Sequence, residues 1–378
     1  MPQKEGSTEF TPNEYPPFPD DQCKTVELET ISLKKLLEKN TVEEERAFTA
    51  FKTRGFVYLE LGGTENGKTI LKGSEDICRI GEQFFRLNQD EKIKYRLGNK
   101  ELFGQVLQFP CASSILHCSL LTTIDSYKIA GATRTDKSGT PDTAEFMNVA
   151  KNEMIILDEQ MRRPWPKVVT DSKQIFASYS RAAHTTGMHI MIMIMGKLGV
   201  DPNEITSRHV FEENAGDHVR ITRGPPRDNS DLPEIQTPSH TDFGTITILM
   251  NWLGGLQVWS KSARKAGALE FMPDAEGEWL WVKPKRGCAI VNLGDAAVKF
   301  TNGVLCSGRH RVVPAPGDQG LWPRYSVVYF VRPTDHCKLK TLKGEGIPMA
   351  DDTDEEGIEA KEWIFRQAIN LGTQYLDN

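Results

Sequence analysis

The amino-acid sequence predicts an α+β fold in which a double-stranded β-helix, or jelly roll, follows a helical N-terminal half. The first observation is a helical pattern over Asp171–Leu198, where apolar residues recur with a period of about 3.6 and which Gly199 ends. The second is a change after Phe211 to short apolar runs separated by Gly and Pro. The expected strands are 218–222, 245–250, 255–259, 279–282, 289–292, 310–313 and 325–331. Such strands are typical of a two-sheet jelly roll, which the long helix would back.

The chain is expected to form one catalytic domain with a short segment at each end. The predicted parts are a flexible, proline-rich arm (1–24), a helical and mixed region (25–200), the jelly-roll core of the same domain (201–335) and a C-terminal helical extension (336–378). The final helix is expected at about 358–371.

The N-terminal region alternates between short strands and helices. A strand is expected at 26–28. A helix is expected over 41–53, where Thr41 could cap its start and Gly55 would end it. A strand at 56–59 and a helix over 77–97 follow. The prediction is weaker for 101–166, where the polar, turn-rich stretch 131–139 is either a disordered loop or a lid over a pocket.

Composition excludes several classes of function. The chain has 378 residues, of which 38% are hydrophobic and 26% charged, as in ordinary globular proteins. A net charge of −6 without a basic run argues against nucleic-acid binding, and no apolar run is long enough to span a membrane. Seven cysteines without C-x-x-C spacing favour reduced thiols. We therefore expect a soluble, cytoplasmic enzyme, and the sequence does not indicate its oligomeric state.

His240 and Asp242 are separated by one residue at the start of a predicted strand. In an extended chain such residues project from the same face, so an imidazole and a carboxylate stand side by side. His310, 68 positions after Asp242, also enters an apolar run. Two histidines and one carboxylate are the facial triad of non-haem iron(II) oxygenases. A structural cluster or a hydrolytic zinc site remains an alternative interpretation.

A second pair lies near the C-terminal end of the predicted jelly roll. Arg324 and Ser326 are again two residues apart on a predicted strand. A guanidinium and a hydroxyl on one face form a receptor for a carboxylate. An ion pair inside the jelly roll is the alternative role for Arg324.

With these three motifs in this order, the sequence resembles the iron(II)- and 2-oxoglutarate-dependent oxygenases of the isopenicillin N synthase-like family, over about residues 26–330. The resemblance implies that His240, Asp242 and His310 bind Fe(II), and that Arg324 and Ser326 hold the cosubstrate 2-oxoglutarate. It also implies a dioxygenase that uses O2 to hydroxylate, desaturate or rearrange a small organic molecule, with specialised metabolism as the expected setting. The alternatives are a 2-oxoglutarate-independent iron oxidase of the isopenicillin N synthase type and a zinc-dependent hydrolase with a cupin-like barrel.

The sequence departs from the family where a tyrosine followed by proline is common. Gly224 precedes Pro225 at that place, so we expect extra space in the pocket. Arg223 and Arg309 could offer charge to an acidic or phenolic substrate, although exposed or paired arginines are the alternative. Phe243 and Phe300 are predicted pocket walls, with core packing as the alternative.

Overall fold

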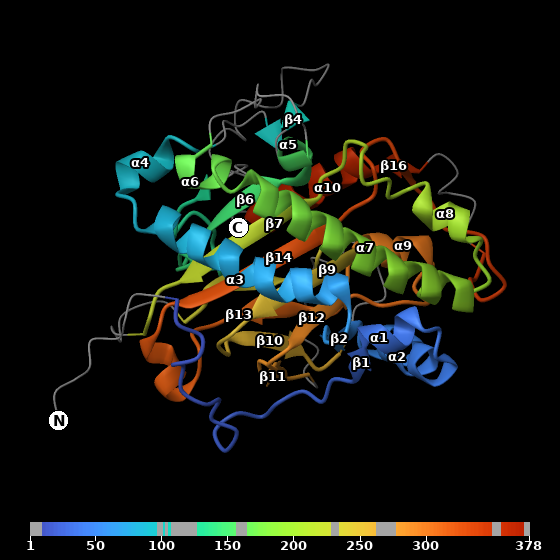
Figure 1. Ribbon diagram of the computed structural model, residues 1–378, viewed down its shortest axis with the longest axis horizontal. Helices are drawn as coiled ribbons and strands as arrows, with labels where there is room; N and C mark the ends of the chain where they lie inside the picture. Colours follow the sequence, from blue (N-terminus) through green and yellow to red (C-terminus); the bar gives the residue numbers. More distant parts are fainter. Residues whose placement is uncertain are drawn as a thin grey trace.

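A computed structural model of the protein describes residues 10–96, 101–102, 105–106, 127–155, 165–227, 234–261, 277–349 and 357–373. In this part of the chain, strands form two main sheets, and helices cover one face of the larger sheet (Figure 1). The architecture therefore agrees with the predicted α+β jelly roll.

The larger sheet has the strand order β1-β2-β12-β9-β14-β7-β6-β5. Its strands are β1 (Thr30–Ser32), β2 (Phe56–Glu60), β12 (Cys288–Leu293), β9 (Ile246–Asn251), β14 (Arg324–Val331), β7 (His218–Gly224), β6 (Glu145–Ala150) and β5 (Tyr127–Lys128). Apart from the parallel pair β1–β2, neighbouring strands run antiparallel. Side chains therefore alternate between a face that meets the helices and a face that meets the smaller sheet.

The smaller sheet has the order β11-β10-β13-β8. It consists of β11 (Trp279–Trp281), β10 (Leu256–Trp259), β13 (His310–Val312) and β8 (Thr237–His240). A buried cluster that includes Tyr58, Leu249 and Ile290 of the larger sheet and Val258 and Leu280 of the smaller one fills the space between the sheets. This is the interior of the jelly roll, and it stays apolar at this end.

The other face of the larger sheet is covered by α3 (Glu65–Phe85) and α7 (Lys173–Lys197), which cross it side by side in Figure 1. The main core lies here, and it includes Val219 and Ile221 of β7, both with 0% exposure. Gly81 and Gly187 permit close contact, since a Cβ at Gly81 would lie 2.5 Å from Ile221. The expected backing helix is thus confirmed.

The remaining helices are short. They are α1 (Leu33–Leu37), α2 (Thr41–Thr53), α4 (Gln89–Ile93), α5 (Lys151–Ile155), α6 (Lys167–Thr170), α8 (Pro202–Thr206), α9 (Asp295–Phe300) and a 3₁₀ turn (Gly317–Leu321). The longer α10 (Ala360–Thr373) lies near the C-terminus. Small pairings join β3 (Glu101–Leu102) to β4 (Gln105–Val106) and β15 (Lys338–Leu339) to β16 (Ile358–Glu359).

Several N-terminal elements differ from the sequence prediction. The helix expected over 77–97 begins earlier, because Thr64 caps α3 by accepting a hydrogen bond from the Gly67 amide, and it ends at Phe85. Asn88 then caps the separate helix α4. The strand expected at 26–28 is shifted to β1, and α2 begins where predicted but is capped by Asn40 rather than Thr41. Local side-chain caps thus moved the boundaries without changing the fold.

Residues 10–24 do not behave as the flexible arm that was expected. Phe10 is 5% exposed and packs edge-on against Trp252, with ring centroids 4.6 Å apart. Its amide donates a hydrogen bond to Glu82 of α3. Tyr15 packs against Trp322 in the same way. The aromatic side chains therefore hold this proline-rich segment against the domain.

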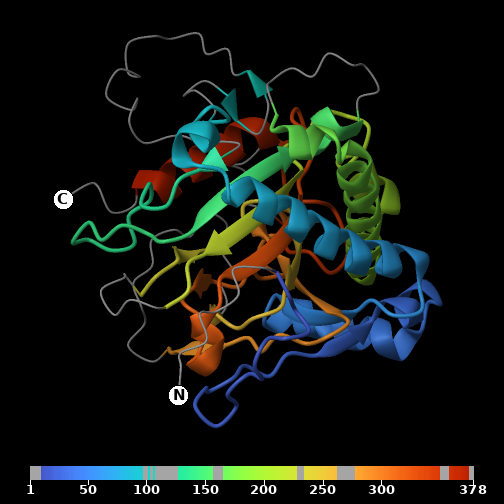
Figure 2. The same cartoon turned by 60° about the vertical axis from the view of Figure 1, so that its left-hand side comes forward.

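The stretch 131–139 is an ordered turn that extends from the β5 edge of the sheet (Figure 2). Backbone hydrogen bonds join Thr135 to Thr140 and Thr133 to Asp142. The carboxylate of Asp142 also accepts hydrogen bonds from Lys128 and the Gly131 amide. Of the two expectations for this stretch, disorder is thus wrong.

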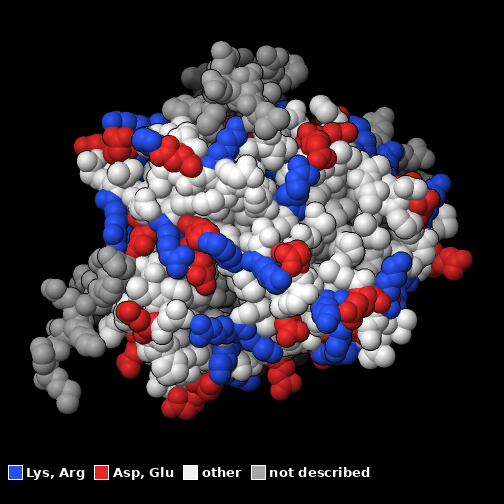
Figure 3. All heavy atoms as spheres, in the orientation of Figure 1, with Lys and Arg blue, Asp and Glu red and all other residues white. Residues whose placement is uncertain are grey.

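The face covered by α3 and α7 carries positive and negative side chains close together (Figure 3). Ion pairs such as Lys72–Asp76 and Lys68–Glu65 follow α3. Across this face, opposite charges neutralise each other locally, without a large patch of one sign. Within the described residues, no helix is long and apolar enough to cross a membrane.

Candidate metal centre

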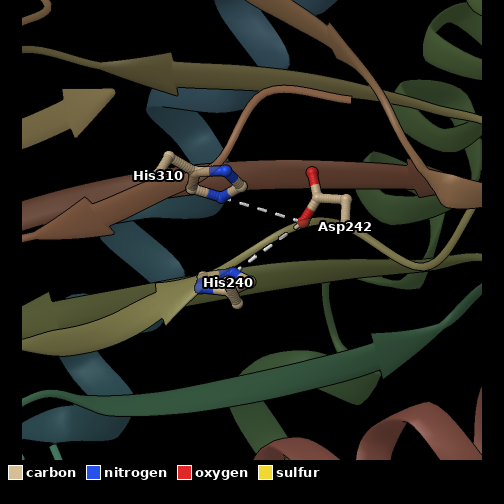
Figure 4. A group of neighbouring side chains, drawn as sticks. All are labelled: His240, Asp242 and His310. Atoms are coloured by element: carbon tan, nitrogen blue, oxygen red, sulfur yellow. Dashed lines mark ion pairs between the residues drawn. The ribbon is translucent and has the colours of Figure 1, made fainter. Parts of the chain in front are cut away.

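The two histidines of the predicted triad come from adjacent strands of the smaller sheet. His240 ends β8 and His310 begins β13, and their Cα atoms are partners in the antiparallel register. Their rings lie with centroids 4.3 Å apart (Figure 4). Sheet pairing therefore brings together two residues that are far apart in the sequence.

A backbone carbonyl fixes the tautomer of each ring. Nδ1 of His240 lies 2.8 Å from the Pro238 oxygen, and Nδ1 of His310 lies 3.0 Å from the Gly308 oxygen. Because a carbonyl only accepts, Nδ1 must carry the proton in both rings. Each Nε2 then keeps its lone pair and can bind a metal ion.

Asp242 completes the group from the loop after β8. Its Oδ1 lies 3.9 Å from Nε2 of His240 and 3.9 Å from Nε2 of His310 (Figure 4). Its Oδ2 accepts a hydrogen bond of 2.7 Å from Nδ2 of Asn292. Asn292 thus occupies one carboxylate oxygen and leaves the other directed toward the two Nε2 atoms.

Burial and the neighbouring charges set the protonation of this group. Burial, together with the charge of His310, lowers the pKa of His240 to about 3, so its ring is neutral near pH 7. Burial raises the pKa of Asp242, but the neighbouring imidazoles of His310 and His240 and the Asn292 hydrogen bond outweigh it and hold that pKa below its usual value. A neutral imidazole and an ionised carboxylate are the forms that bind metal.

Asp295 connects the two segments that carry the triad. It lies in the first turn of α9, and its carboxylate accepts hydrogen bonds from Thr241 at 3.0 Å and Ser307 at 2.7 Å. Thr241 stands between His240 and Asp242, and Ser307 stands three residues before His310. A buried carboxylate with two donors therefore fixes both loops relative to each other.

The ligand atoms of His240, Asp242 and His310 all lie within 4.8 Å of one another, and no other such group of three occurs in the described residues. Two neutral imidazoles and one carboxylate fit the facial triad of a non-haem iron(II) site. The chemistry of the donor set is thus compatible with Fe(II).

Arg324 and Ser326 lie on β14, on the face that meets the smaller sheet. Arg324 is 2% exposed, and its Nε donates a hydrogen bond of 2.7 Å to the Gly254 carbonyl. Gly255 must be glycine here, since its φ is +112° and a Cβ would lie 2.7 Å from Arg324 Nε. Ser326 is 4% exposed and points the same way two residues further on. The predicted carboxylate receptor therefore has its two groups side by side.

Comparisons with known proteins identify the family. The profile of the 2OG-Fe(II) oxygenase superfamily matches residues 215–333. A 2-oxoglutarate-dependent dioxygenase of Aspergillus fumigatus is 30% identical over 350 residues, which cover 89% of this chain and 83% of the relative. The chain belongs to the 2OG-Fe(II) oxygenase superfamily. It is a 2-oxoglutarate-dependent dioxygenase that uses Fe(II), 2-oxoglutarate and O2.

Further relatives agree with this identification. The 2-oxoglutarate-dependent dioxygenase gloE of Glarea lozoyensis is 26% identical over 328 residues, covering 85% of this chain and 84% of the relative. Among solved structures, a Neurospora crassa protein in complex with alpha-KG and 5-formyluracil superposes with a TM-score of 0.65 at 20% identity, covering 90% of this chain and 96% of the other. JOX2 in complex with 2OG, Fe and JA gives a TM-score of 0.57 at 18% identity, over 96% and 95% of the chains. These structures support the jelly-roll fold.

Gly224 does not give the dioxygenase the extra pocket space that was expected. A Cβ at Gly224 would lie 2.2 Å from Oε1 of Gln236, a residue that is 1% exposed. The Gln236 amide, which donates to the Pro225 carbonyl at 3.3 Å, fills this space instead. Because Gly224 pairs with Arg324 in the sheet, Gln236 stands beside the predicted carboxylate receptor.

The four predicted pocket residues of the dioxygenase lie in different surroundings. Arg223 forms an ion pair of 3.1 Å with Glu145, while Arg309 donates a hydrogen bond of 3.0 Å to Ser239. Phe300 is fully buried in the main core, where its ring packs against His209. The structure thus corrects the prediction for Phe300 and Arg223, which are packed or paired away from the triad.

Phe243 directly follows Asp242 and is 9% exposed. It packs with Ile364 of α10, in a small cluster that also includes Trp363. The C-terminal helix therefore covers the residue next to the triad.

Sequence reasoning missed Asn292 and Gln236, which lie beside Asp242 and Arg324 respectively. Asn292 lies between Val291 and Leu293 of β12, which are both buried in the main core, so this alternation alone could have placed Asn292 in the interior of the jelly roll. Gln236 offered no such signal, because its contact with Gly224 depends on how two sheets meet.

Proposed function

We propose that His240, Asp242 and His310 bind the iron of this dioxygenase and that Arg324 and Ser326 bind the distal carboxylate of 2-oxoglutarate. The observation that carries the first assignment is the pair of carbonyl-bound Nδ1 atoms, which leaves two Nε2 lone pairs and one Asp242 oxygen facing a common point. The assignment of Arg324 to the 2-oxoglutarate site is supported by its burial, because a desolvated guanidinium favours a carboxylate that binds it through two hydrogen bonds.

The remaining residues keep these groups in position. Asn292 orients Asp242, and Asp295 holds the loops that carry the histidines. The hydrogen bond to Gly254 leaves the terminal nitrogens of Arg324 for a ligand. Bound together, iron, 2-oxoglutarate and O2 supply an oxidant strong enough to attack a C–H bond. Side chains around the metal then decide which bond is presented.

The substrate is proposed to be a small organic molecule of a specialised-metabolite pathway. The neighbouring structures of the Neurospora crassa protein and of JOX2 were determined with 5-formyluracil and JA, which are small organic ligands of those proteins. The sequence relatives named above are fungal dioxygenases with most of their length aligned. The outcome of the reaction depends on substrate pose, so it does not follow from the fold.

Arg324→Ala tests the cosubstrate assignment. Loss of a charge-assisted bond in a desolvated site costs roughly 2–5 kcal/mol, so the apparent KM for 2-oxoglutarate should rise by well over tenfold. Iron binding should be unchanged, because Arg324 is not among the three metal-binding side chains. Arg311→Ala is a matched control, since Arg311 donates to Gln257 and stacks on Trp279 in the smaller sheet. Equal KM values in all three proteins would refute the assignment.

A further inference from the structure

Side chains along β7 alternate between the two faces of the larger sheet, and this alternation places Arg220 in the interior of the jelly roll. Its neighbours Val219 and Ile221 are fully buried in the main core under α3 and α7. Arg220 must therefore point to the opposite face. There it pairs in register with Val328 of β14, which shares its face with Arg324 and Ser326. Arg220 thus projects toward the side of the sheet that holds the candidate site.

Contacts hold the Arg220 guanidinium in one plane and leave its end open. Nε donates a hydrogen bond of 2.8 Å to Oδ1 of Asn148. The guanidinium carbon lies 4.1 Å from the ring centroid of Phe146 and 5.2 Å from that of Phe330. Within the described residues, neither terminal nitrogen has a hydrogen-bond partner, and the side chain is partly exposed. The two Nη groups therefore form an unused fork.

The charge around Arg220 is not balanced by protein groups alone. Burial lowers the pKa of Arg220 to about 10, but the nearby charge of Asp242 opposes this, and the guanidinium stays positive near pH 7. Asp242 is also the proposed metal ligand, and the other buried cation nearby, Arg332, lies close to Asp217 and Asp335. No carboxylate of the described residues is within ion-pair distance of Arg220.

The proposed ligands leave this charge uncompensated. The two charges of Fe(II) and the one of Arg324 balance the carboxylate of Asp242 and the two carboxylates of 2-oxoglutarate. Arg220 then remains as an extra positive charge that is only partly exposed to solvent, which favours an anion as its partner. Arg220 lies opposite Val328, four residues from Arg324 along β14, or about 13 Å of strand. It is therefore separate from the receptor for the distal carboxylate.

We propose that the substrate of this dioxygenase is an organic acid whose carboxylate binds the two terminal nitrogens of Arg220. This inference rests on the iron and 2-oxoglutarate sites proposed above. A planar carboxylate matches the guanidinium fork, and the rings of Phe146 and Phe330 beside the fork favour an apolar or aromatic remainder of the acid. Arg220 would thus determine specificity by selecting acids over neutral analogues.

Isothermal titration of the protein loaded with Mn(II) and 2-oxoglutarate tests this proposal without requiring turnover. The probes are acids and their amides in pairs: benzoate and benzamide, phenylacetate and phenylacetamide, hexanoate and hexanamide. At least one acid should bind about tenfold or more tightly than its amide, because a charged hydrogen-bonded pair replaces a neutral one. Arg220→Gln should abolish this preference.

Arg223→Gln is the matched control, because Arg223 lies on the same strand but faces the other way and pairs with Glu145. Glu145 keeps Lys92 and Tyr127 as partners in that variant, so the control should fold and retain the acid preference. Arg220→Lys provides a second test if the glutamine variant unfolds. It keeps the charge but not the fork, so it should retain a reduced preference for the acid.

The outcomes separate this proposal from the one on which it rests. If no acid binds the wild-type protein better than its amide, or if Arg220→Gln keeps the preference, the proposal is overturned. It is also overturned if Arg220→Gln weakens 2-oxoglutarate binding tenfold, because Arg220 would then belong to the cosubstrate site. Failure of the wild-type protein to bind Mn(II) and 2-oxoglutarate would instead refute the proposed function, and a separate titration of 2-oxoglutarate detects it.

Discussion

The triad of His240, Asp242 and His310 can be compared with a second buried group of the same composition, formed by His184, His209 and Asp217. His184 lies on α7, His209 follows α8 and Asp217 precedes β7. All three are at most 6% exposed. The two groups nevertheless differ in how their ring nitrogens are used, and this difference separates a site that can bind metal from one that supports the fold.

Every ring nitrogen of the second group is occupied. Nε2 of His184 lies 3.0 Å from the His209 carbonyl, and its Nδ1 lies 3.1 Å from Oδ2 of Asp217. Both ring nitrogens of His184 are thus taken up by protein oxygens, and neither faces a position where a metal ion could bind. Asp217 also accepts from Tyr329 and from the Arg332 amide. This group therefore joins α7 to the sheet.

His209 is held in the neutral form by burial, which lowers its pKa to about 4. Its Nδ1 donates to the Ile205 carbonyl at 2.8 Å, so its Nε2 accepts from the Thr245 hydroxyl at 2.7 Å. In the triad, by contrast, one nitrogen of each ring is tied to a carbonyl and the other is left facing Asp242. Spare lone pairs on the ring nitrogens, rather than the presence of histidine, thus distinguish the proposed metal site from the second group.

The largest expected effect comes from removing a spare lone pair. His310→Gln should reduce metal affinity by more than about 100-fold, which is the upper range for loss of a residue that only orients a ligand. Turnover should fall to background, while the unfolding free energy of the metal-free protein should change by about 1 kcal/mol or less. The metal content that remains after dialysis reports the metal affinity, and urea unfolding measures the unfolding free energy. Full metal loading of the variant would contradict the assignment of His310.

The opposite pattern is expected for the second group. His184→Leu removes one partner of a buried ion pair and should cost about 3–5 kcal/mol of unfolding free energy. Metal stoichiometry should stay at the wild-type value, since His184 has no spare lone pair. His189→Leu on the exposed side of α7 is the matched control and should be nearly neutral. If His184→Leu instead lowered the metal stoichiometry and left the unfolding free energy unchanged, the proposed division between a metal-binding group and a structural group would be wrong.

Sequence spacing predicted the triad because its geometry is mostly local. His240 and Asp242 follow one another on an extended segment, and His310 needed only to lie on a neighbouring strand. The pocket residues were harder, because each depends on distant partners. Arg223 is directed to Glu145, 78 residues away, whereas Arg220 on the same strand faces the interior.

Gly224 and Phe300 were misjudged for related reasons. The space beside Gly224 is filled by Gln236, which approaches from the connection into the smaller sheet. Phe300 belongs to α9, a short helix that the strand pattern did not predict, and its packing against His209 turns it into the main core. The local pattern of apolar and turn residues thus determined which helices and strands form, while contacts between these elements determined which side chains reach the site.

The smallest expected effect is a difference in the pH dependence of stability. Burial lowers the pKa of His209 to about 4, below the ordinary value of 6.5. The unfolded chain therefore takes up a proton that the folded protein does not bind, as pH falls from about 6.5 toward 4. The stabilisation is fully present above pH 6.5 and is lost over this interval, by roughly 3 kcal/mol in total.

His209→Gln removes this one titrating group and leaves those of the triad in place. The unfolding free energy of the metal-free wild-type protein should therefore fall more steeply between pH 6.5 and 4 than that of the variant, by about 1.4 kcal/mol per pH unit. Urea unfolding of both proteins at pH 7, 6 and 5 measures the slopes, and metal-free protein excludes any contribution from ligand protonation to metal release. Parallel slopes would mean that His209 is protonated in the fold, with Nε2 donating to Thr245. The second group would then contain a protonated His209, and its difference from the triad would rest on the triad's spare lone pairs alone.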